Sequence, residues 1–281
     1  MDAFSEIKSQ EPRVLGCRQD LERFTIIDNP DDLRLLAASV KDEPIEIIYV
    51  CTNSTVGVIG GLFSNLTYLG LEGPIGYIPS NICDKLEHLH ISAESNVKEI
   101  PTDISPALIS LIIEDGNFIT HIPSNISPCL KHFSLYTHHR VTECPGDISS
   151  VLTSLDLNGE GSLSAIPVDL PPCLEYLYIN IANEKITNIP SGVFSSLKYL
   201  HISGGTITKI PENISPELVV LQIFYNKVNI KEFPEYISPK FEHLEVTGEK
   251  YKYDSSTLDY CVTVHDNNGL SFVSYSYFQP I

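Results

Sequence analysis

The dipeptide Ile-Pro, or a close relative of it, returns along this chain at a nearly constant interval. The prolines in this register are Pro79, Pro101, Pro123, Pro145, Pro167, Pro190, Pro211 and Pro234. Successive members are 22, 22, 22, 22, 23, 21 and 23 residues apart. A fixed period on the order of 20 to 50 residues is the signature of a repeat architecture built from stacked supersecondary units. The period therefore predicts a solenoid.

A second pattern, apolar-x-x-apolar-x-apolar, recurs between the prolines. Its nine clear copies begin at Leu66, Leu86, Leu108, Leu130, Leu152, Leu174, Leu197, Leu218 and Phe241. A weaker copy, with Ile45, Ile48 and Val50, precedes them. Together these copies predict ten units between residues 45 and 247.

Each unit contains one short segment in which apolar and outward-facing residues alternate. In Leu177-Tyr178-Ile179, for example, the alternation is that of a strand with one buried face. An Asp or Asn two residues after the proline is expected to accept hydrogen bonds from nearby backbone N–H groups and to start a turn. The prolines exclude long helices, so the convex side is predicted to consist of extended segments and short turns.

The consensus LxxLxIxxxxxITxIPxxISPx resembles the leucine-rich repeat, in a short, proline-rich form of 20 to 23 residues. It is most similar to the repeats of secreted bacterial effectors, and it is also similar to the 22-residue repeats of amoebae and their giant viruses. The resemblance covers about 200 of the 281 residues. It implies a leucine-rich-repeat solenoid whose parallel β-sheet forms the concave face.

The two ends of the chain depart from the repeat, as the caps of a solenoid must. Residues 1–44 are predicted to form an amino-terminal region with a short capping helix at residues 31–40. Residues 248–281 contain Asn268-Gly269 between two β-prone runs, which predicts a β-hairpin as the carboxyl-terminal cap. The domain organisation is therefore 1–44, 45–247 and 248–281.

The charge balance restricts the partners. The formal net charge is −18, from 36 acidic and 18 basic side chains. Nucleic acids and anionic membranes would be repelled, whereas a neutral or basic protein would not. Residues 1–14 have neither a basic start nor an apolar core, so no signal peptide is expected. We expect a cytoplasmic protein, or one in a host's cytoplasm if it is an effector or viral protein.

Sequence motifs for catalysis are absent. The chain has no GxxxxGK[ST], GxGxxG, HExxH or GxSxG motif and no CxxC pair. Bacterial effectors with ubiquitin-ligase activity carry a large catalytic domain after the repeats, whereas about 35 residues follow the last unit here. We therefore expect no enzymatic activity and no cofactor.

Two columns of residues are predicted to face outward from the concave sheet. The first column is Ile47, Tyr68, His88, Ser110, His132, Ser154, Tyr176, Tyr199, Val220 and His243. The second column is Tyr49, Gly70, His90, Ile112, Ser134, Asp156, Tyr178, His201, Gln222 and Glu245. Five of the nine histidines and five of the fourteen tyrosines fall in these columns, and no lysine or arginine does.

This enrichment predicts a protein-binding surface, because tyrosine combines a large apolar area with a polar tip at low entropic cost. Tyr176 should lie near Tyr199, and Tyr178 near His201. The candidate binding residues are Tyr176, Tyr178, Tyr199, His201, Gln222, Phe224, His88, His90 and His132. Binding is expected to weaken as the pH falls through about 6.5, where an unperturbed histidine gains charge.

Two other interpretations of the columns remain open. The aromatic side chains could serve only to stabilise a parallel sheet. Alternatively, His88, His90 and His132 could hold a metal ion, although sheet spacing places His132 about 10 Å from His88, so we expect no metal site.

Three functions are compatible with these patterns. The first is an intracellular module that binds a protein partner on its concave face. The second is a substrate-recruiting subunit of an enzyme complex such as a ubiquitin ligase, or a secreted-effector scaffold. The third is a purely structural repeat without a single ligand. The sequence favours the first and leaves the oligomeric state open.

The cysteines generate a prediction about redox state. Cys129 and Cys173 hold the same position in units that are not neighbours, too far apart for a disulfide. Mass spectrometry after alkylation under non-reducing conditions should therefore find no stoichiometric intramolecular disulfide. A fully occupied Cys129–Cys173 bridge would contradict both the stacking register and the reducing setting.

Overall fold

The computed structural model describes most of the repeat region and short segments on either side of it. The described residues are 25–27, 47–50, 66–71, 76–91, 96–114, 118–136, 141–159, 163–181, 185–191, 194–224, 238–248, 261–266 and 271–274. The predicted capping helix at 31–40 and the predicted turn at Asn268-Gly269 lie outside them.

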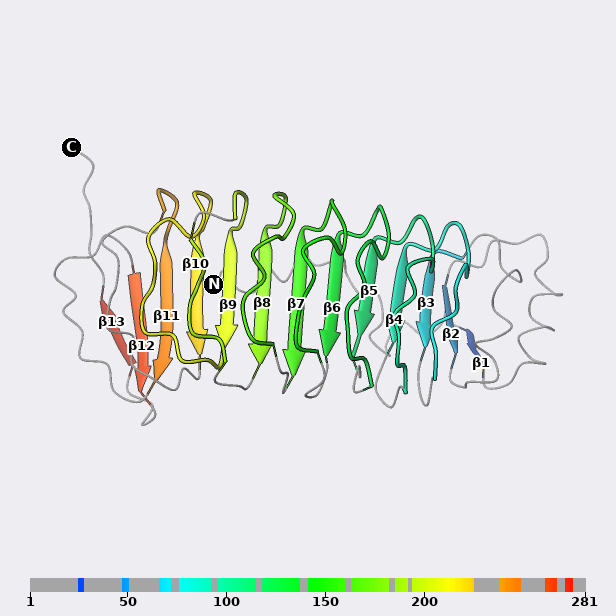
Figure 1. The fold of residues 1–281 in the computed structure, drawn as a ribbon, viewed down its shortest axis with the longest axis horizontal. Coiled ribbons are helices and arrows are strands. Elements are labelled where there is room, and N and C mark those ends of the chain that lie inside the picture. Colours follow the sequence, from blue (N-terminus) through cyan, green and yellow to red (C-terminus); the bar gives the residue numbers. More distant parts are fainter. Residues whose placement is uncertain are drawn as a thin grey trace.

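The described strands form a single sheet whose spatial order follows the chain order, from β1 to β13 (Figure 1). The strands are β1 (Thr25–Ile27), β2 (Ile47–Val50), β3 (Tyr68–Leu71), β4 (His88–Ile91), β5 (Ser110–Ile113), β6 (His132–Tyr136), β7 (Ser154–Gly159), β8 (Tyr176–Ile181), β9 (Tyr199–Ser203), β10 (Val220–Phe224), β11 (His243–Gly248), β12 (Cys261–Asp266) and β13 (Ser271–Ser274).

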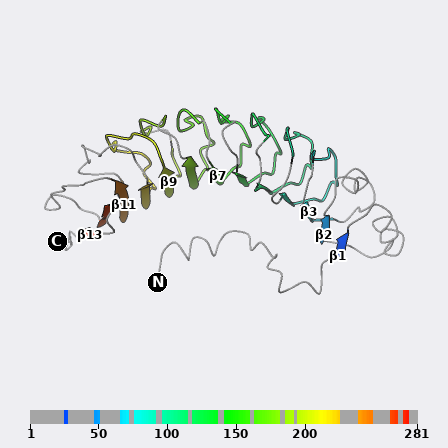
Figure 2. The same cartoon turned by 90° about the horizontal axis from the view of Figure 1, so that it is seen from below.

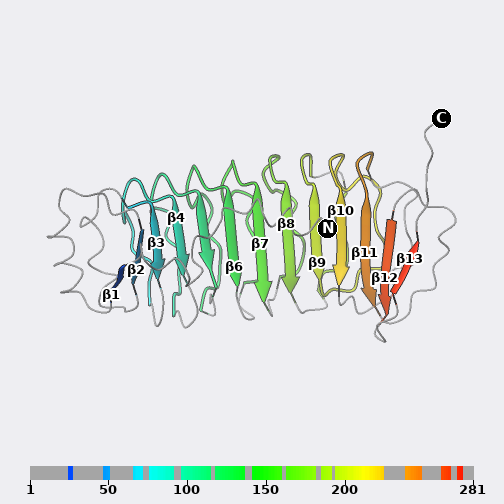
Figure 3. The same ribbon diagram turned by 180° about the vertical axis from the view of Figure 1, so that it is seen from behind.

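The sheet lies on the inner side of an arc, and the returning segments lie on the outer side (Figure 2). The same succession of strands is visible from behind (Figure 3). The described residues contain no α-helix, and hence none with the length and apolarity needed to cross a membrane. The predicted parallel solenoid is confirmed, with the ten predicted units supplying β2 to β11.

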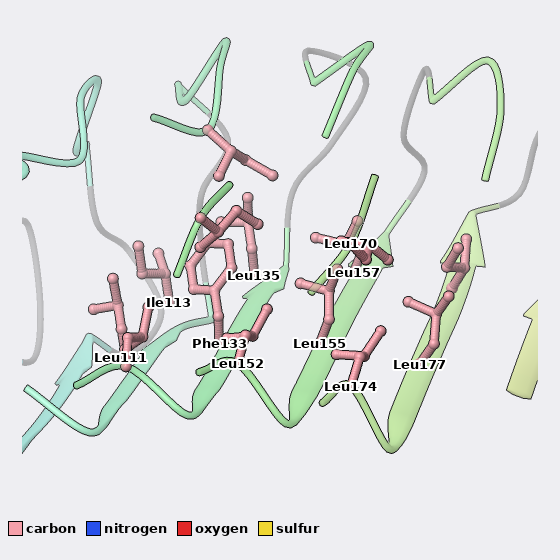
Figure 4. Close-up of a cluster of buried hydrophobic side chains, with 14 of the residues drawn as sticks. Leu111, Ile113, Phe133, Leu135, Leu152, Leu155, Leu157, Leu170, Leu174 and Leu177 are labelled. Carbon is pink, nitrogen blue, oxygen red and sulfur yellow. The ribbon is translucent and has the colours of Figure 1, made fainter. Parts of the chain in front are cut away.

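The parallel strands are paired so that equivalent residues of successive units lie side by side. Leu155 of β7 pairs with Leu177 of β8, and Leu177 pairs with Leu200 of β9. These leucines are fully buried, as are the apolar residues two positions further along each strand, Ile179 and Ile202. Figure 4 shows such side chains converging between the sheet and the outer segments. A unit cannot bury this face alone, so the core exists only in the stack.

The sheet extends beyond the predicted units at both ends. β1 pairs parallel with β2, and β12 pairs parallel with β11. The segments expected to form a hairpin, β12 and β13, do pair antiparallel. Sequence periodicity missed the parallel pairings of β1 and β12 because neither strand belongs to a recognisable copy of the repeat. The capping role of these ends remains a prediction.

The turn after the proline works differently from the expectation. Asn81, Asn125 and Asn213 adopt left-handed backbone conformations, with φ of 50°, 54° and 54°. Asparagine tolerates this region better than most residues. The Asn125 N–H donates to the Asp147 carbonyl of the next coil at 2.8 Å. These residues therefore shape the backbone and link successive coils, in place of the expected side-chain bonds to nearby N–H groups.

A ladder of buried serines, which the sequence analysis did not predict, runs along the outer side. Ser105, Ser127, Ser149, Ser215 and Ser238 each follow an isoleucine and are buried. We call the three whose hydroxyls donate to a carbonyl of the preceding coil, Ser105, Ser127 and Ser238, the inter-coil serines. The Ser127 hydroxyl donates to the Leu108 carbonyl of the preceding coil at 3.1 Å and accepts the Cys129 N–H at 3.3 Å. The first of these bonds satisfies a buried carbonyl that would otherwise lack a partner.

Cysteine takes over this task where the serine is missing. Pro171 occupies the serine position in its unit, and the Cys173 thiol lies 3.3 Å from the Leu152 carbonyl, the group that a serine there would reach. Cys83, Cys129, Cys144 and Cys173 are all free. Burial raises the pKa of the Cys144 thiol to about 12, so this cysteine stays protonated and behaves as a small apolar residue.

The inter-coil bonds yield a stability prediction. Ser127→Ala should lower the free energy of unfolding by about 1 to 3 kcal/mol, because it leaves the buried Leu108 carbonyl without its partner. The measurement is the midpoint of urea denaturation. As a control, Thr120→Ala changes an exposed position and should alter stability by no more than about 0.5 kcal/mol. Equal midpoints for both variants would show that the serine bonds do not stabilise the stack.

Candidate functional site

The concave residues of β8 to β11 meet in rows that cross the strands. Tyr176 pairs with Tyr199, which pairs with Val220, which pairs with His243. Tyr178 pairs with His201, which pairs with Gln222, which pairs with Glu245. Phe224 extends the same face of β10 by one outward position. The structure thus brings together six of the candidate binding residues, which we call the aromatic patch: Tyr176, Tyr178, Tyr199, His201, Gln222 and Phe224.

The rings of the aromatic patch are stacked. The Tyr176 and Tyr199 centroids are 4.7 Å apart, with an angle of 5° between the ring planes. The Tyr178 and His201 centroids are 4.0 Å apart at 15°. Phe224 then meets His201 edge-on at 5.0 Å. Because parallel strands are spaced by about 4.8 Å, an in-register row of planar side chains adopts this stacking without backbone adjustment.

A chain of hydrogen bonds fixes the inner part of the patch. The Tyr199 hydroxyl donates to Gln222 Oε1, and His201 Nδ1 lies 3.2 Å from the same oxygen. Since an amide oxygen can only accept, Nδ1 of His201 carries the proton. Gln222 Nε2 in turn donates to Glu245 Oε2 at 2.7 Å. Glu245 therefore holds the Gln222 amide in place, and Gln222 in turn fixes the orientation of the Tyr199 and His201 rings.

Burial divides the aromatic patch into a floor and an accessible part. Tyr199, His201 and Gln222 are 3%, 4% and 6% exposed. Tyr176, Tyr178 and Phe224 are half-buried. The sequence placed all six residues on the concave face but could not separate these two groups, because the burial of each side chain depends on how its neighbours pack.

The pKa of His201, in the buried part of the aromatic patch, differs from that of an ordinary histidine. Burial lowers the pKa of His201 to about 4, and the Gln222 hydrogen bond and the Glu245 charge only partly oppose this. The expectation that His201 gains charge as the pH falls through about 6.5 is therefore wrong. Burial, together with the charge of Asp156 on the adjoining strand, also raises the pKa of Tyr178.

The remaining three candidate residues form a separate group near the other end of the concave face. His88 and His132 lie on either side of Ser110, one strand away from each. Burial lowers the pKa of both imidazoles, and the charge of His88 contributes to the lowering at His132. β7, with Ser154 and Asp156, separates this group from Tyr176 and Tyr178.

His90 is held by its own neighbours. Its Nδ1 lies 3.4 Å from the Tyr68 hydroxyl. Its Nε2 lies 3.1 Å from Glu114 Oε1, but the geometry is not that of a hydrogen bond. Within the described part of the chain, no three His, Cys, Asp or Glu side chains are placed so that they could hold a metal ion.

Comparison with known proteins places the fold. No protein-family model matches the chain, and no curated protein does either. Among solved structures, the functional domain of InlJ from Listeria monocytogenes, described as including a cysteine ladder, is similar with a TM-score of 0.57 and 18% sequence identity. The similarity covers 77% of this chain and 46% of that one, so this chain spans about half of that chain's length. The fold is a leucine-rich-repeat solenoid.

The buried histidine leads to a prediction about pH. Between pH 6.5 and 4, His201 binds a proton in the unfolded chain but not in the folded one, so acidification favours unfolding. One pKa unit corresponds to about 1.4 kcal/mol, so this residue should remove up to about 3 kcal/mol of stability by pH 4.

The measurement is the free energy of unfolding against pH for the native chain and for His201→Gln, which stays neutral. The variant should lose less stability between pH 6.5 and 4. Parallel curves for the two proteins would show that His201 has an ordinary pKa, and an NMR titration of its imidazole would decide this directly.

Proposed function

We propose that this chain is a protein-interaction module that binds a protein partner on its concave face, with the aromatic patch at the centre of the interface. The leucine-rich-repeat solenoid is typical of protein-interaction modules, which supports the general assignment. The proposal that binding occurs on the concave face rests on the division of the aromatic patch into a buried and a half-buried part. Half-buried Tyr176, Tyr178 and Phe224 rest on a buried, hydrogen-bonded floor.

Such an arrangement suits binding because the rings are ordered before a partner arrives. Tyr176 and Tyr178 are each stacked against a ring of β9, so little side-chain entropy remains to be lost on association. Aromatic anchors of this kind provide most of the free energy in many interfaces. The histidine group at His88, His90 and His132 would form the outer part of the same surface.

The competing interpretation is that the stacked rings only stabilise the sheet. It fits Tyr199 well, because that residue is buried and its hydroxyl is bonded within the protein. It fits Tyr176 and Tyr178 less well, because a purely structural ladder has no need of half-exposed rings. Variants of the accessible pair therefore separate the two interpretations better than any variant of Tyr199 would.

The test is capture of partner proteins from a lysate of the cells that express the chain, compared between the native protein and Tyr176→Ala with Tyr178→Ala. Proteins retained by the native chain should be lost, because removing interface anchors commonly costs about 2 kcal/mol or more each. The matched control is Tyr77→Ala with Phe118→Ala. It removes two exposed aromatic residues, 47% and 39% accessible, that lie outside the strands.

Loss of the same proteins in the control variant and not in the tyrosine variant would move the interface off the concave face. Collapse of the melting temperature in the tyrosine variant would instead show that these rings stabilise the sheet.

A further inference from the structure

The two ring nitrogens of His201 differ in their hydrogen bonding. Nδ1 lies 3.2 Å from Gln222 Oε1. Nε2 forms no hydrogen bond with any residue that the structure describes. The side chain is nevertheless almost completely buried, with 4% of the residue exposed. Most polar atoms in such surroundings have a partner within the protein, so the unpaired nitrogen of His201 calls for an explanation.

The unpaired nitrogen reaches the surface of the protein. In the described part of the chain, the fully buried side-chain nitrogen and oxygen atoms without a hydrogen bond are His90 Nε2 and Asp156 Oδ1. His201 Nε2 also lacks a hydrogen bond but is not one of these fully buried atoms, so it belongs to the small exposed part of His201. Nε2 lies at the end of the imidazole ring that is remote from the backbone. It is therefore open to a group that approaches the concave face.

The hydrogen bonds of the aromatic patch make this nitrogen an acceptor. The Glu245 carboxylate can only accept, so the Gln222 nitrogen must face it, at 2.7 Å. The Gln222 oxygen then faces Tyr199 and His201, and the proton of the imidazole lies on Nδ1. Burial lowers the pKa of His201 to about 4, so the ring is neutral near pH 7. Nε2 therefore keeps its lone pair.

Aromatic rings lie on either side of the imidazole. The Tyr178 ring is stacked on it at a centroid distance of 4.0 Å, and the Phe224 ring meets it edge-on at 5.0 Å. Both residues are half-buried, and the Tyr178 side chain is hydrogen-bonded to Asn180. A group that reaches Nε2 therefore contacts aromatic side chains as well as one polar atom. An aromatic ring with a hydrogen-bond donor at its tip suits these surroundings.

We propose that the protein partner places a tyrosine side chain against Tyr178 and Phe224, with its hydroxyl donating a hydrogen bond to Nε2 of His201. A phenol combines an aromatic body with an O–H donor that is more acidic than that of serine or threonine. A phenylalanine in the same place would cover the nitrogen without pairing it, which is unfavourable. This inference rests on the proposed function, since it names the group that the same surface recognises.

The probe for the test is N-acetyl-tyrosine-N-methylamide, titrated into the full chain with 15N-labelled histidine. Before titration, the His201 signals, assigned by their loss in His201→Phe, should show a protonated Nδ1 and an unprotonated Nε2. Addition of the probe should move the Nε2 signal toward that of a protonated nitrogen. The O-methyl-tyrosine analogue keeps the ring but has no donor, so it should bind at least about fivefold more weakly.

Two variants connect this preference to His201. His201→Phe keeps a planar ring beside Tyr178 but removes Nε2, so the two probes should bind it equally. The Gln222 oxygen retains the Tyr199 hydroxyl as a donor in this variant, and its melting temperature shows whether it folds. The matched control His121→Phe changes an exposed histidine outside the strands and should retain the native preference. If His201→Phe does not fold, the comparison of the two probes on the native chain still decides.

Equal affinities of the two probes for the native chain, or a proton on Nε2 of the free protein, would overturn the tyrosine proposal. Equally tight binding of N-acetyl-serine-N-methylamide would overturn the requirement for an aromatic donor. The proposed function would survive these results if Tyr176→Ala with Tyr178→Ala still abolished partner capture. Unimpaired capture by the folded tyrosine variant would overturn the proposed function as well.

Discussion

No single coil of this protein can shield its own apolar side chains, so each coil is stable only against its neighbours. Each of the strands β3 to β11 contributes a leucine or phenylalanine at its centre, and the paired residues of adjacent strands complete the burial. Backbone bonds between the asparagine and aspartate turns and the inter-coil serines repeat the same linkage on the outer side. All other features of the structure depend on this one-to-one stacking.

The arrangement of side chains on the concave surface follows from this one-to-one stacking of the coils. With one strand per unit and no slip in register, side chains at equivalent positions are separated by the spacing of the strands, about 4.8 Å. This spacing is close to that of stacked rings, so the 4.7 Å between Tyr176 and Tyr199 is set by the backbone. The chain controls the surface by the residue it places at each position, and the change from Asp156 to Tyr178 in one row shows how sharply its character can vary.

The sequence was a good guide to those features that depend on the period. The proline register and the apolar triplets predicted ten parallel strands and the pairing of Tyr176 with Tyr199, because stacking converts separation along the chain into proximity. The sequence did not predict those features that are determined by local packing. The burial of His201 and its low pKa depend on Gln222, Glu245 and the adjoining rings together. The hydroxyl bond of Ser127 was missed because serine before proline looks like ordinary turn chemistry.

The inter-coil serines also bear on how such a chain changes over evolutionary time. Ser105 bonds to the Leu86 carbonyl and Ser127 to the Leu108 carbonyl, so the two junctions are chemically the same. Excision of residues 105–126 would bring Ser127 against Leu86 in the place of Ser105, with the same hydrogen bond and the same apolar neighbours. Unequal recombination can therefore shorten or lengthen the array one coil at a time. Side chains of units that were not adjacent then become neighbours, while the bonds between the joined coils are kept.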